Sequence, residues 1–528
     1  MKKLLSLLLI LVLLLAVSGC GKSEPLVGSG TEDDPYRIST AGQLFQMAEL
    51  INGKDTAREY QKSHYLITAD IDLGGKKWEP IDYFKGVLDG GNHTVSNFRI
   101  NNRKLLHVGI VSNVYDGTVK NLTVSDATIS GSSKSAQVAA IVGNCVNGFM
   151  ENCHTTESVT VKSTYSAAGV CNTYNTDNVF DYCTNAATII SEKSQVGYAC
   201  GVVRSAGGLV SNCINTGTIT SSGDAAGVAG IADGGLFCCT NSGDVTARAY
   251  AAGIVTQFSD GALNSSMNNA GIRLDSCVNT GAITSTEKLA GGIAASCRTG
   301  SIVNCVNSGS VSAPDGAGGI FNYFQRSAFG TPASSFTVSG CTNSGTVTVT
   351  TTVGNNPVGG IGCQIMGSSG ITFLFEDCTN SGTLLTTGQK DVSGSIGSAG
   401  GIIGESSADS ITFRNCTNSG AITGVRYVGG IIGQAQMVDP DELEGTVFIA
   451  ENCSNSGSLY AVDARGLTTA VYCGGIAGID IRFRMEQDVT FETLVYEGCA
   501  NTGTLSGDTD RVPLMAHDIC GSHINTAE

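Results

Sequence analysis

The chain has 528 residues, of which 70 are Gly and only 8 are Pro, and 14% of its residues are charged against 41% hydrophobic. This composition excludes a collagen-like repeat, which needs Pro as well as Gly, and also a charge-rich disordered chain. The net charge of −16 argues against a nucleic-acid partner and against electrostatic attachment to anionic lipids. We therefore expect a folded chain with a sizeable core.

The first segment has the pattern of a secretory signal. Lys2 and Lys3 precede an apolar run that is shorter than the roughly 20 residues of a membrane-spanning helix, and Cys20 follows two small residues. This start resembles that of bacterial lipoproteins. We predict a signal peptide over residues 1–19 and an acylated Cys20 that begins a polar tether over residues 20–34. An ordinary signal peptide with an incidental Cys is the alternative. If Cys20 is acylated, the chain is expected to lie on the extracellular face of the cell membrane.

Residues 35–131 are predicted to form an N-terminal cap and the first coils of a repeat structure. Thr40-Ala-Gly-Gln43 is a capping box, and the four apolar residues Leu44, Met47, Ala48 and Ile51 that follow share one face of a helix. Such a helix can cover the open end of a repeat structure. Trp78, the only Trp, is interpreted as core, with a sugar-stacking platform as the alternative.

Between residues 132 and 507 the chain repeats one phrase, Cys-x-Asn, followed mostly by Ser or Thr and Gly, at spacings of 26 to 46 residues. A branched aliphatic stands six residues after each Cys, and a Gly-Gly-Ile phrase or a near relative lies between most copies. Short apolar pieces separated by Gly, Asn and Ser indicate strands joined by tight turns, so one copy is predicted to be one coil of a parallel β-solenoid. The ten cysteines are Cys183, Cys213, Cys239, Cys277, Cys305, Cys341, Cys378, Cys416, Cys453 and Cys499.

Residues at equivalent places in successive coils stack about 4.8 Å apart, so the repeated Cys and Asn are predicted to form structural ladders. Asn343, Asn380 and Asn418 represent the Asn ladder, in which amides hydrogen-bond from coil to coil. The cysteines are interpreted as packed, unpaired thiols. A metal site or a disulfide framework is the alternative, but the spacing that either needs is missing. Residues 508–528 are predicted to be a C-terminal cap or tail.

Four phrases near the N-terminus carry a resemblance to a known family: Gly28–Ile38, Thr68–Leu73, Trp78–Ile81 and Phe84–Val95. They resemble the N-terminal segment of bacterial surface proteins that carry the GLUG motif, and the later repeats are similar to GLUG repeats. The resemblance implies an all-β fold, a right-handed parallel β-helix on the outside of a cell. Asp82 departs from the Gly that is usual after Trp-x-Pro-Ile in this family.

The repeats differ most in length between the Gly-Gly-Ile phrase and the next Cys, where the longest inserts occur. If each copy is one coil, these inserts leave from one corner and form a candidate binding face. Phe321, Tyr323, Phe324 and Phe329 concentrate aromatic area there and are candidate ligand contacts, with a satellite core as the equal alternative. The inserts are Thr256–Ile272, Asn322–Phe336, Gln434–Thr446 and Asp480–Glu492.

No catalytic motif, cofactor motif or metal-ligand spacing is found, so we expect no cofactor, no metal and no enzymatic activity. Asp70 and Asp72 could touch calcium, although such a pair is usually a solvated face. The sequence therefore predicts a lipid-anchored adhesion, binding or stalk module whose ligand is a host protein, a matrix component or a glycan. The alternative is a β-helix polysaccharide lyase or hydrolase, which would need clustered carboxylates. A secreted inhibitor or a subunit of a larger complex is a further class.

Overall fold

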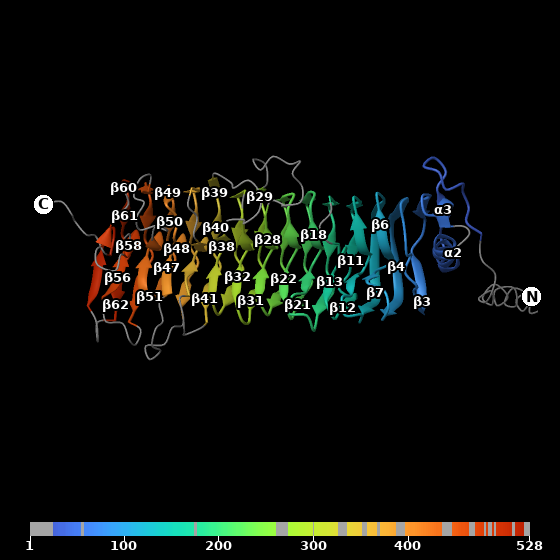
Figure 1. Ribbon diagram of the computed structural model, residues 1–528, viewed down its shortest axis with the longest axis horizontal. Helices are drawn as coiled ribbons and strands as arrows, with labels where there is room; N and C mark the ends of the chain where they lie inside the picture. The colour runs from blue at the N-terminus through green and yellow to red at the C-terminus, as the bar shows by residue number, and fades with distance from the viewer. Residues whose placement is uncertain are drawn as a thin grey trace, which may run out of the picture.

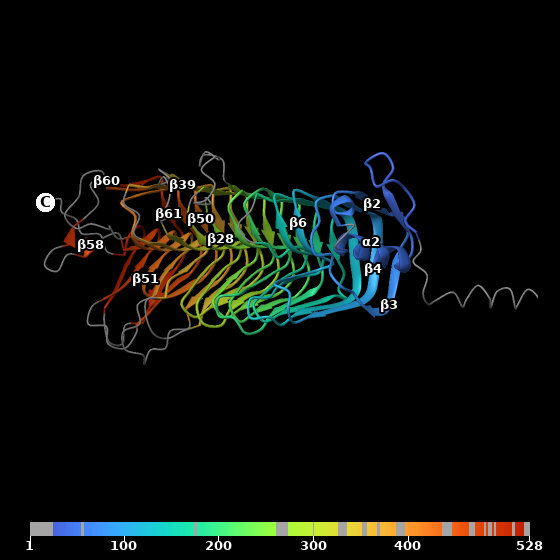
Figure 2. The ribbon, with the colours of Figure 1, turned by 45° about the vertical axis from the view of Figure 1, so that its right-hand side comes forward.

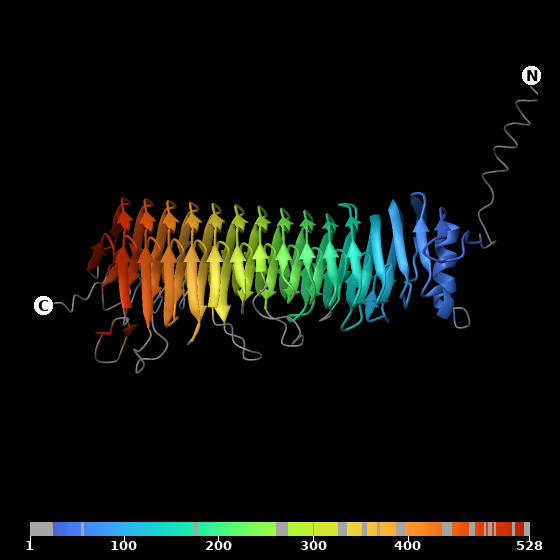
Figure 3. The ribbon, with the colours of Figure 1, turned by 90° about the horizontal axis from the view of Figure 1, so that it is seen from above.

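The computed structural model describes residues 25–53, 57–173, 177–259, 273–298, 300–325, 335–350, 356–366, 370–386, 397–435, 446–463, 470–479, 482–483, 488–489, 493–508 and 513–521. Parallel strands stack side by side along one long axis, and the first described coils lie at the opposite end from the last ones (Figure 1). The same regular stacking is seen from above in Figure 3. The predicted parallel β-helix is confirmed.

The predicted capping helix is present at one end of the stack, as α2 (Ala41–Asn52), followed by the single turn α3 (Ala57–Tyr60) (Figure 2). The Thr40 hydroxyl accepts a hydrogen bond from the backbone N–H of Gln43 at 3.2 Å, and the Gln43 side chain accepts one from the N–H of Ser39 at 2.8 Å. These contacts satisfy N–H groups that a helix start leaves unpaired. The buried face consists of Leu44, Met47, Ala48 and Ile51.

Trp78 lies beneath this helix as part of the core, because only 1% of its surface is exposed and its ring lies 5.4 Å from the ring of Phe45. Its indole N–H donates to the carbonyl oxygen of Ile110 at 3.0 Å. The ring faces of Trp78 are therefore enclosed, which corrects the alternative of a sugar-stacking platform.

A typical repeat forms one coil with five short strands, which are two or three residues apart in the coil of residues 273–297. Each strand pairs in parallel with its equivalent in the coils before and after it. A representative coil contains β29 (Arg273–Asp275), β30 (Val278–Asn279), β31 (Ile283–Ser285), β32 (Leu289–Gly291) and β33 (Ala294–Cys297).

The core runs without interruption along the axis. One column of inward-facing residues can be followed by strand register through fifteen successive coils, and fourteen intervals of about 4.8 Å give a length of about 67 Å. Its members are Tyr36, Tyr65, Leu88, Val119, Met150, Phe180, Val210, Leu236, Leu274, Ile302, Val338, Phe375, Phe413, Ala450 and Tyr496.

Two columns of strands border the candidate functional site. We call the first the arm; it contains β5 (His107–Val108), β8 (Gln137–Ala139), β13 (Ser166–Ala168), β17 (Tyr198–Cys200), β22 (Asp224–Ala226), β27 (Tyr250–Ala252), β32, β37 (Gly316–Gly318), β42 (Val358–Gly359), β47 (Gly397–Gly400), β51 (Ile422–Gly429), β56 (Val471–Gly474) and β63 (Leu514–His517). We call the second the wall; it begins with the pair β6 (Val111–Tyr115) and β9 (Val142–Val146) and continues as the nine-stranded sheet of β18 (Val203–Ala206), β23 (Ala229–Ala232), β28 (Val255–Phe258), β33, β38 (Phe321–Gln325), β43 (Gly362–Met366), β48 (Ile403–Ser406), β52 (Ile432–Ala435) and β57 (Ala477–Ile479).

A ladder of Asn side chains, buried in all but the last coil, connects ten successive coils. In each rung the amide nitrogen of one Asn donates to the amide oxygen of the next Asn at 2.7–2.8 Å, from Asn185 to Asn501. The second amide hydrogen binds the backbone carbonyl two residues later, as from Asn343 to Gly345 at 3.0 Å. The structure places Asn343, Asn380 and Asn418 in the middle of this ladder.

The Gly-Gly-Ile phrase packs directly against the Asn ladder. A Cβ atom at Gly319 would overlap the carbonyl oxygen of Gly360 and the side-chain amide of Asn343, and the equivalent clash with Gly430 and Asn418 would occur at Gly401. Only Gly lets the backbone approach the ladder so closely.

The repeated cysteines form a second buried column of unpaired thiols beside the Asn ladder. Cys341, for example, donates through its sulfur to the carbonyl oxygen of Ile302 in the preceding coil at 3.6 Å, and burial raises the pKa of its thiol. Cys153 extends the column by one coil, although it is followed by His-Thr instead of the usual phrase. Nine of the ten repeat cysteines are buried, and Cys499, in the last coil, is only half-buried.

The residue before each ladder cysteine occupies the left-handed backbone region, which turns the chain between two strands. Asn304 has a φ of 54° and Asn415 a φ of 52°, and Cys238 occupies this position with a φ of 53°. Asn tolerates this conformation best among residues with side chains. Cys238 is therefore exposed on the corner, whereas its neighbour Cys239 is buried in the ladder.

The Asn ladder should contribute measurably to stability. Asn343→Ala removes the acceptor of the Asn307 amide and the donor to the Asn380 oxygen, and each buried group left unpaired costs about 1–3 kcal/mol. We expect urea unfolding to show this loss. Thr342→Ala, at the adjacent half-buried position, is the control and should change the free energy of unfolding by about 0.5 kcal/mol or less. Equal effects of the two variants would contradict a role for the ladder.

Thiol reactivity should follow burial. Under native conditions we expect iodoacetamide to modify Cys238 rapidly and Cys499 more slowly, while the buried ladder cysteines react only after denaturant is added. Peptide mass spectrometry after timed labelling measures the order. Rapid labelling of Cys341 or Cys378 in the native protein would contradict the inward orientation of the ladder.

Candidate functional site

The four aromatic residues that were predicted from the sequence to contact a ligand do not form one exposed surface. Phe321 and Phe324 are 0% exposed, and the Phe324 ring lies edge-on to that of Phe373 at 5.0 Å in the core. They are therefore packing residues, which corrects the prediction that they contact a ligand. Tyr323 points outward and is half-buried, and Phe329 lies outside the described residues, as does Cys20.

The physical reason lies in the register of the wall strands. Pairing runs through the first, third and fourth residue of each strand and omits the second, as in Ala294↔Phe321, Ser296↔Tyr323 and Cys297↔Phe324. Strict alternation is therefore broken, and the first and fourth residues both face the core. The third residue faces outward.

The arm and the wall meet at a concave corner, where outward side chains of the two columns touch one another. His107 Nδ1 lies 2.7 Å from Asn113 Oδ1 near the N-terminal end, and Ser398 Oγ donates to Gln434 Oε1 at 2.8 Å farther along. Between these two places the rings of Tyr250 and Tyr323 are 6.2 Å apart. We call this surface the concave corner.

The middle of the concave corner collects charged groups that are far apart in the sequence. Burial raises the pKa of Asp224 to about 6. The hydrogen bond that its carboxylate accepts from the N–H of Tyr250 at 3.2 Å and the positive charge of Lys288 both act in the opposite direction. Burial, together with Tyr323, raises the pKa of Tyr250 to about 12, while Arg298 acts in the opposite direction. The site therefore combines phenols with groups of both charges.

One coil away, a buried arginine lies between two further tyrosines. Arg204 is 4% exposed, and its guanidinium lies 5.6 Å from the ring centre of Tyr165 and 5.4 Å from that of Tyr198. Such placement favours a cation–π interaction. Sequence reasoning missed this cluster because its members are dispersed between residues 165 and 323. An alignment of the Gly-Gly-Ile phrases, coil by coil, could have predicted that these residues lie close together.

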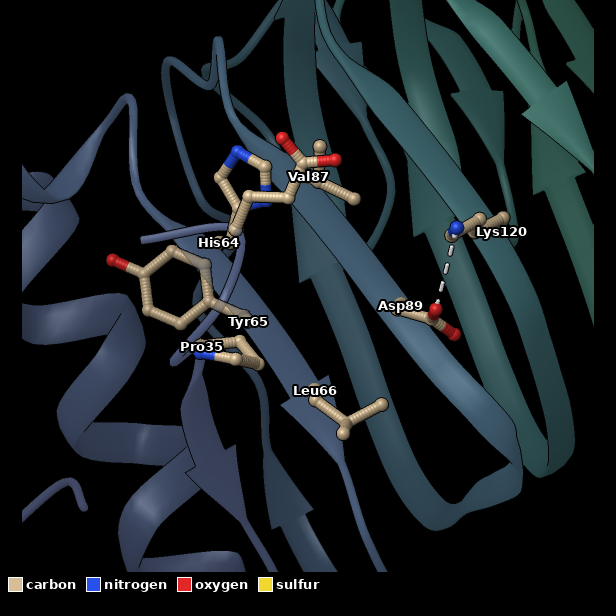
Figure 4. A pocket seen from close by; sticks show the side chains of 8 residues that line it. Pro35, His64, Tyr65, Leu66, Val87, Asp89 and Lys120 are labelled. Atoms are coloured by element: carbon tan, nitrogen blue, oxygen red, sulfur yellow. Dashed lines mark ion pairs between the residues drawn. The ribbon is translucent and has the colours of Figure 1, made fainter. Parts of the chain in front are cut away.

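A hollow of about 200 Å³ lies at the N-terminal end on the outer face of β2 (His64–Ile67), β4 (Val87–Asn102) and β7 (Thr118–Gly131) (Figure 4). Lys120 Nζ lies 3.5 Å from Asp89 Oδ2, so the two charges across the hollow largely neutralise each other. The lining residues are Glu32, Pro35, His64, Tyr65, Leu66, Val87, Asp89 and Lys120.

Asp70 links two neighbouring coils, and Asp72 holds a local turn. Asp70 accepts a hydrogen bond from the N–H of Thr94 at 2.9 Å, which lowers its pKa, and Asp72 accepts one from the N–H of Gly74 at 2.7 Å. Across the described ranges, no group of three or more His, Cys, Asp or Glu side chains is placed to hold a metal ion. No helix in the described part of the chain is long and apolar enough to cross a membrane.

No family model matches the chain. It is 33% identical over 122 residues to Halomucin of Haloquadratum walsbyi, and 31% identical over 130 residues to a provisionally named Gly-rich membrane protein of Evansella cellulosilytica. These matches cover 21% and 22% of this chain but only 1% and 14% of the two relatives.

Among solved structures, a chain provisionally described as an immunoglobulin A1 protease from Bacteroides ovatus is 18% identical. The alignment covers 72% of this chain and 86% of that one, with a TM-score of 0.29.

The raised pKa of Asp224 predicts a pH-dependent stability. Its folded pKa of about 6 exceeds the ordinary 3.8, so the folded state holds a proton that the unfolded state has lost, and this contribution declines as pH rises from 4 to 6. Asp224→Asn should therefore match the wild type at pH 4 and exceed its free energy of unfolding by up to roughly 3 kcal/mol above pH 6.5. Urea unfolding between pH 4 and 8 tests this. A constant difference between the two proteins would exclude the shift.

Proposed function

We propose that this chain is a lipid-anchored module on the outside of a bacterial cell, held at the membrane through Cys20, whose solenoid presents a binding surface to the surroundings. The observation that carries the proposal is the shape of the chain. A continuous core about 67 Å long begins directly after the short N-terminal segment and is covered at that end by α2. An anchor at this end would hold the rest of the solenoid away from the membrane.

Two further observations support the proposal. The first segment has the lipoprotein pattern, in which acyl chains on Cys20 give stable anchoring without a spanning helix. One of the relatives carries the name of a membrane protein, although the match covers a small part of it.

We propose binding instead of catalysis for the same module. Hydrolysis between two sugars by paired carboxylates needs them about 5–10 Å apart. In the concave corner, Asp224 and Glu405 belong to coils that are five steps apart, or about 24 Å along the axis. These two groups therefore do not form such a pair.

Cys20→Ala tests the anchor. Cells fed an alkyne analogue of palmitate should label the wild-type chain and not the variant, and the variant should be released or remain uncleaved because no acyl chain can attach to Ala. Cys238→Ala, which removes an exposed thiol in the solenoid, is the control and should label like the wild type. Equal labelling of Cys20→Ala and the wild type would refute lipid attachment at this residue.

A further inference from the structure

We propose that the middle of the concave corner binds a neutral polysaccharide that runs along the long axis of the solenoid. The site consists of Asp224, Tyr250, Ser296, Arg298 and Tyr323. This inference rests on the proposed function in one respect, that the solenoid is a binding module, and it does not depend on the lipid anchor.

The first observation is a pair of buried polar atoms that have no hydrogen-bond partner within the described chain. Ser296 is 6% exposed, and its hydroxyl is unpaired. Asn322 is 1% exposed; its amide nitrogen donates to the carbonyl oxygens of Ala290 at 3.0 Å and Gly316 at 2.6 Å, but its amide oxygen is unpaired. Buried polar groups normally have a partner, so these atoms indicate a missing one.

Strand register places Ser296 in the outward column of the wall, where its hydroxyl is buried among the neighbouring residues. Ser296 pairs with Gln257 in the coil before it and with Tyr323 in the coil after it. Tyr323 contacts Tyr250 across the corner, whereas Cys297, the next residue along from Ser296, faces the core. Ser296 therefore shares the outward column with Gln257 and Tyr323 and lies between them in coil order.

The second observation is the chemical balance of the site. Tyr250 and Tyr323 are half-buried rings with hydroxyl groups, which combine apolar area with hydrogen bonding. Lys288 and Arg298 are offset by Asp224 and by the nearby Asp315, which lowers the attraction for a polyanion. Hydroxyl, amide and carboxyl groups offer both donors and acceptors. A hydroxyl-rich ring with an apolar face matches this set.

The third observation is repetition. The outward column of the wall contains Gln257, Ser296, Tyr323, Gln364 and Glu405 in successive coils, about 4.8 Å apart, and the first, third and fourth of these side chains are partly exposed. Polar side chains thus recur at a regular interval along a straight line. A linear polymer of similar units can use several of these contacts at once, which a single small molecule cannot do. The geometry therefore favours an extended chain over a monosaccharide.

The test measures binding of defined hexasaccharides to the full chain, purified in detergent, by isothermal titration calorimetry. The probes are the neutral cellohexaose, xylohexaose and mannohexaose, together with the anionic hexagalacturonate. We expect saturable binding of at least one neutral probe. The double variant Tyr250→Ala and Tyr323→Ala should weaken it by about tenfold or more, because aromatic residues carry much of such binding energy.

Two further variants separate binding from folding. Ser296→Ala removes a hydroxyl that has no partner in the free protein, so it should leave the urea midpoint unchanged or raise it while weakening the same probe several-fold. Tyr182→Asn is the matched control: it changes an exposed tyrosine at a corner where other coils carry Asn, and it should bind like the wild type.

Three results with the wild type and the double variant would overturn the proposal: no saturable binding of any neutral probe at millimolar concentration, equal binding by the two proteins, or binding of hexagalacturonate alone. Palmitate labelling of Cys20 is measured separately, so failure of the glycan site is distinguishable from failure of the anchor. A loss of binding by Tyr182→Asn equal to that of the double variant would likewise place the contact away from the concave corner.

Discussion

The hydrogen-bonded ladder of asparagine amides is the interaction around which each coil of this protein is arranged. It fixes the register between coils, because each amide binds the same atom of its neighbour from Asn185 to Asn501. It also requires Gly at the adjacent position of the Gly-Gly-Ile phrase, since any side chain there would overlap the amide. The repeated Cys packs beside it as a small buried group. Three features of the repeat thus follow from one buried polar column.

The ladder explains why the insert lengths can vary so widely without disturbing the fold. From the Cys to the following aliphatic residue the chain contacts the ladder in every coil, and its length stays nearly constant. The rest of each coil varies in length, both before the arm strand, as between Thr386 and Gly397, and after the wall strand, so the spacing between repeats ranges from 26 to 46 residues. Each coil depends mainly on its neighbours, so an insert in one coil has little effect on others.

The sequence predicts those parts of the structure that repeat or that depend on local chemistry. The Asn and Cys positions recur at fixed offsets, and the capping box of α2 lies within four residues. The orientation of Phe321 and Phe324 was not predictable in this way, because the wall strands omit their second residue from pairing and so break alternation. The concave corner depends on contacts such as that between Tyr250 and Tyr323, which are 73 positions apart in the printed sequence. Only coil-by-coil register brings them together.

The direction of the hydrogen bonds between coils has a mechanical consequence. These bonds point along the long axis, as from the Thr342 N–H to the Cys305 oxygen and from the Thr379 N–H to the Cys341 oxygen. A force that pulls the two ends apart acts on the coils in series, and each interface carries the full load. The weakest interface would then open first, while the remaining coils keep their neighbours. The resistance of the solenoid to stretching is accordingly set by its least stable coil and not by the total number of coils.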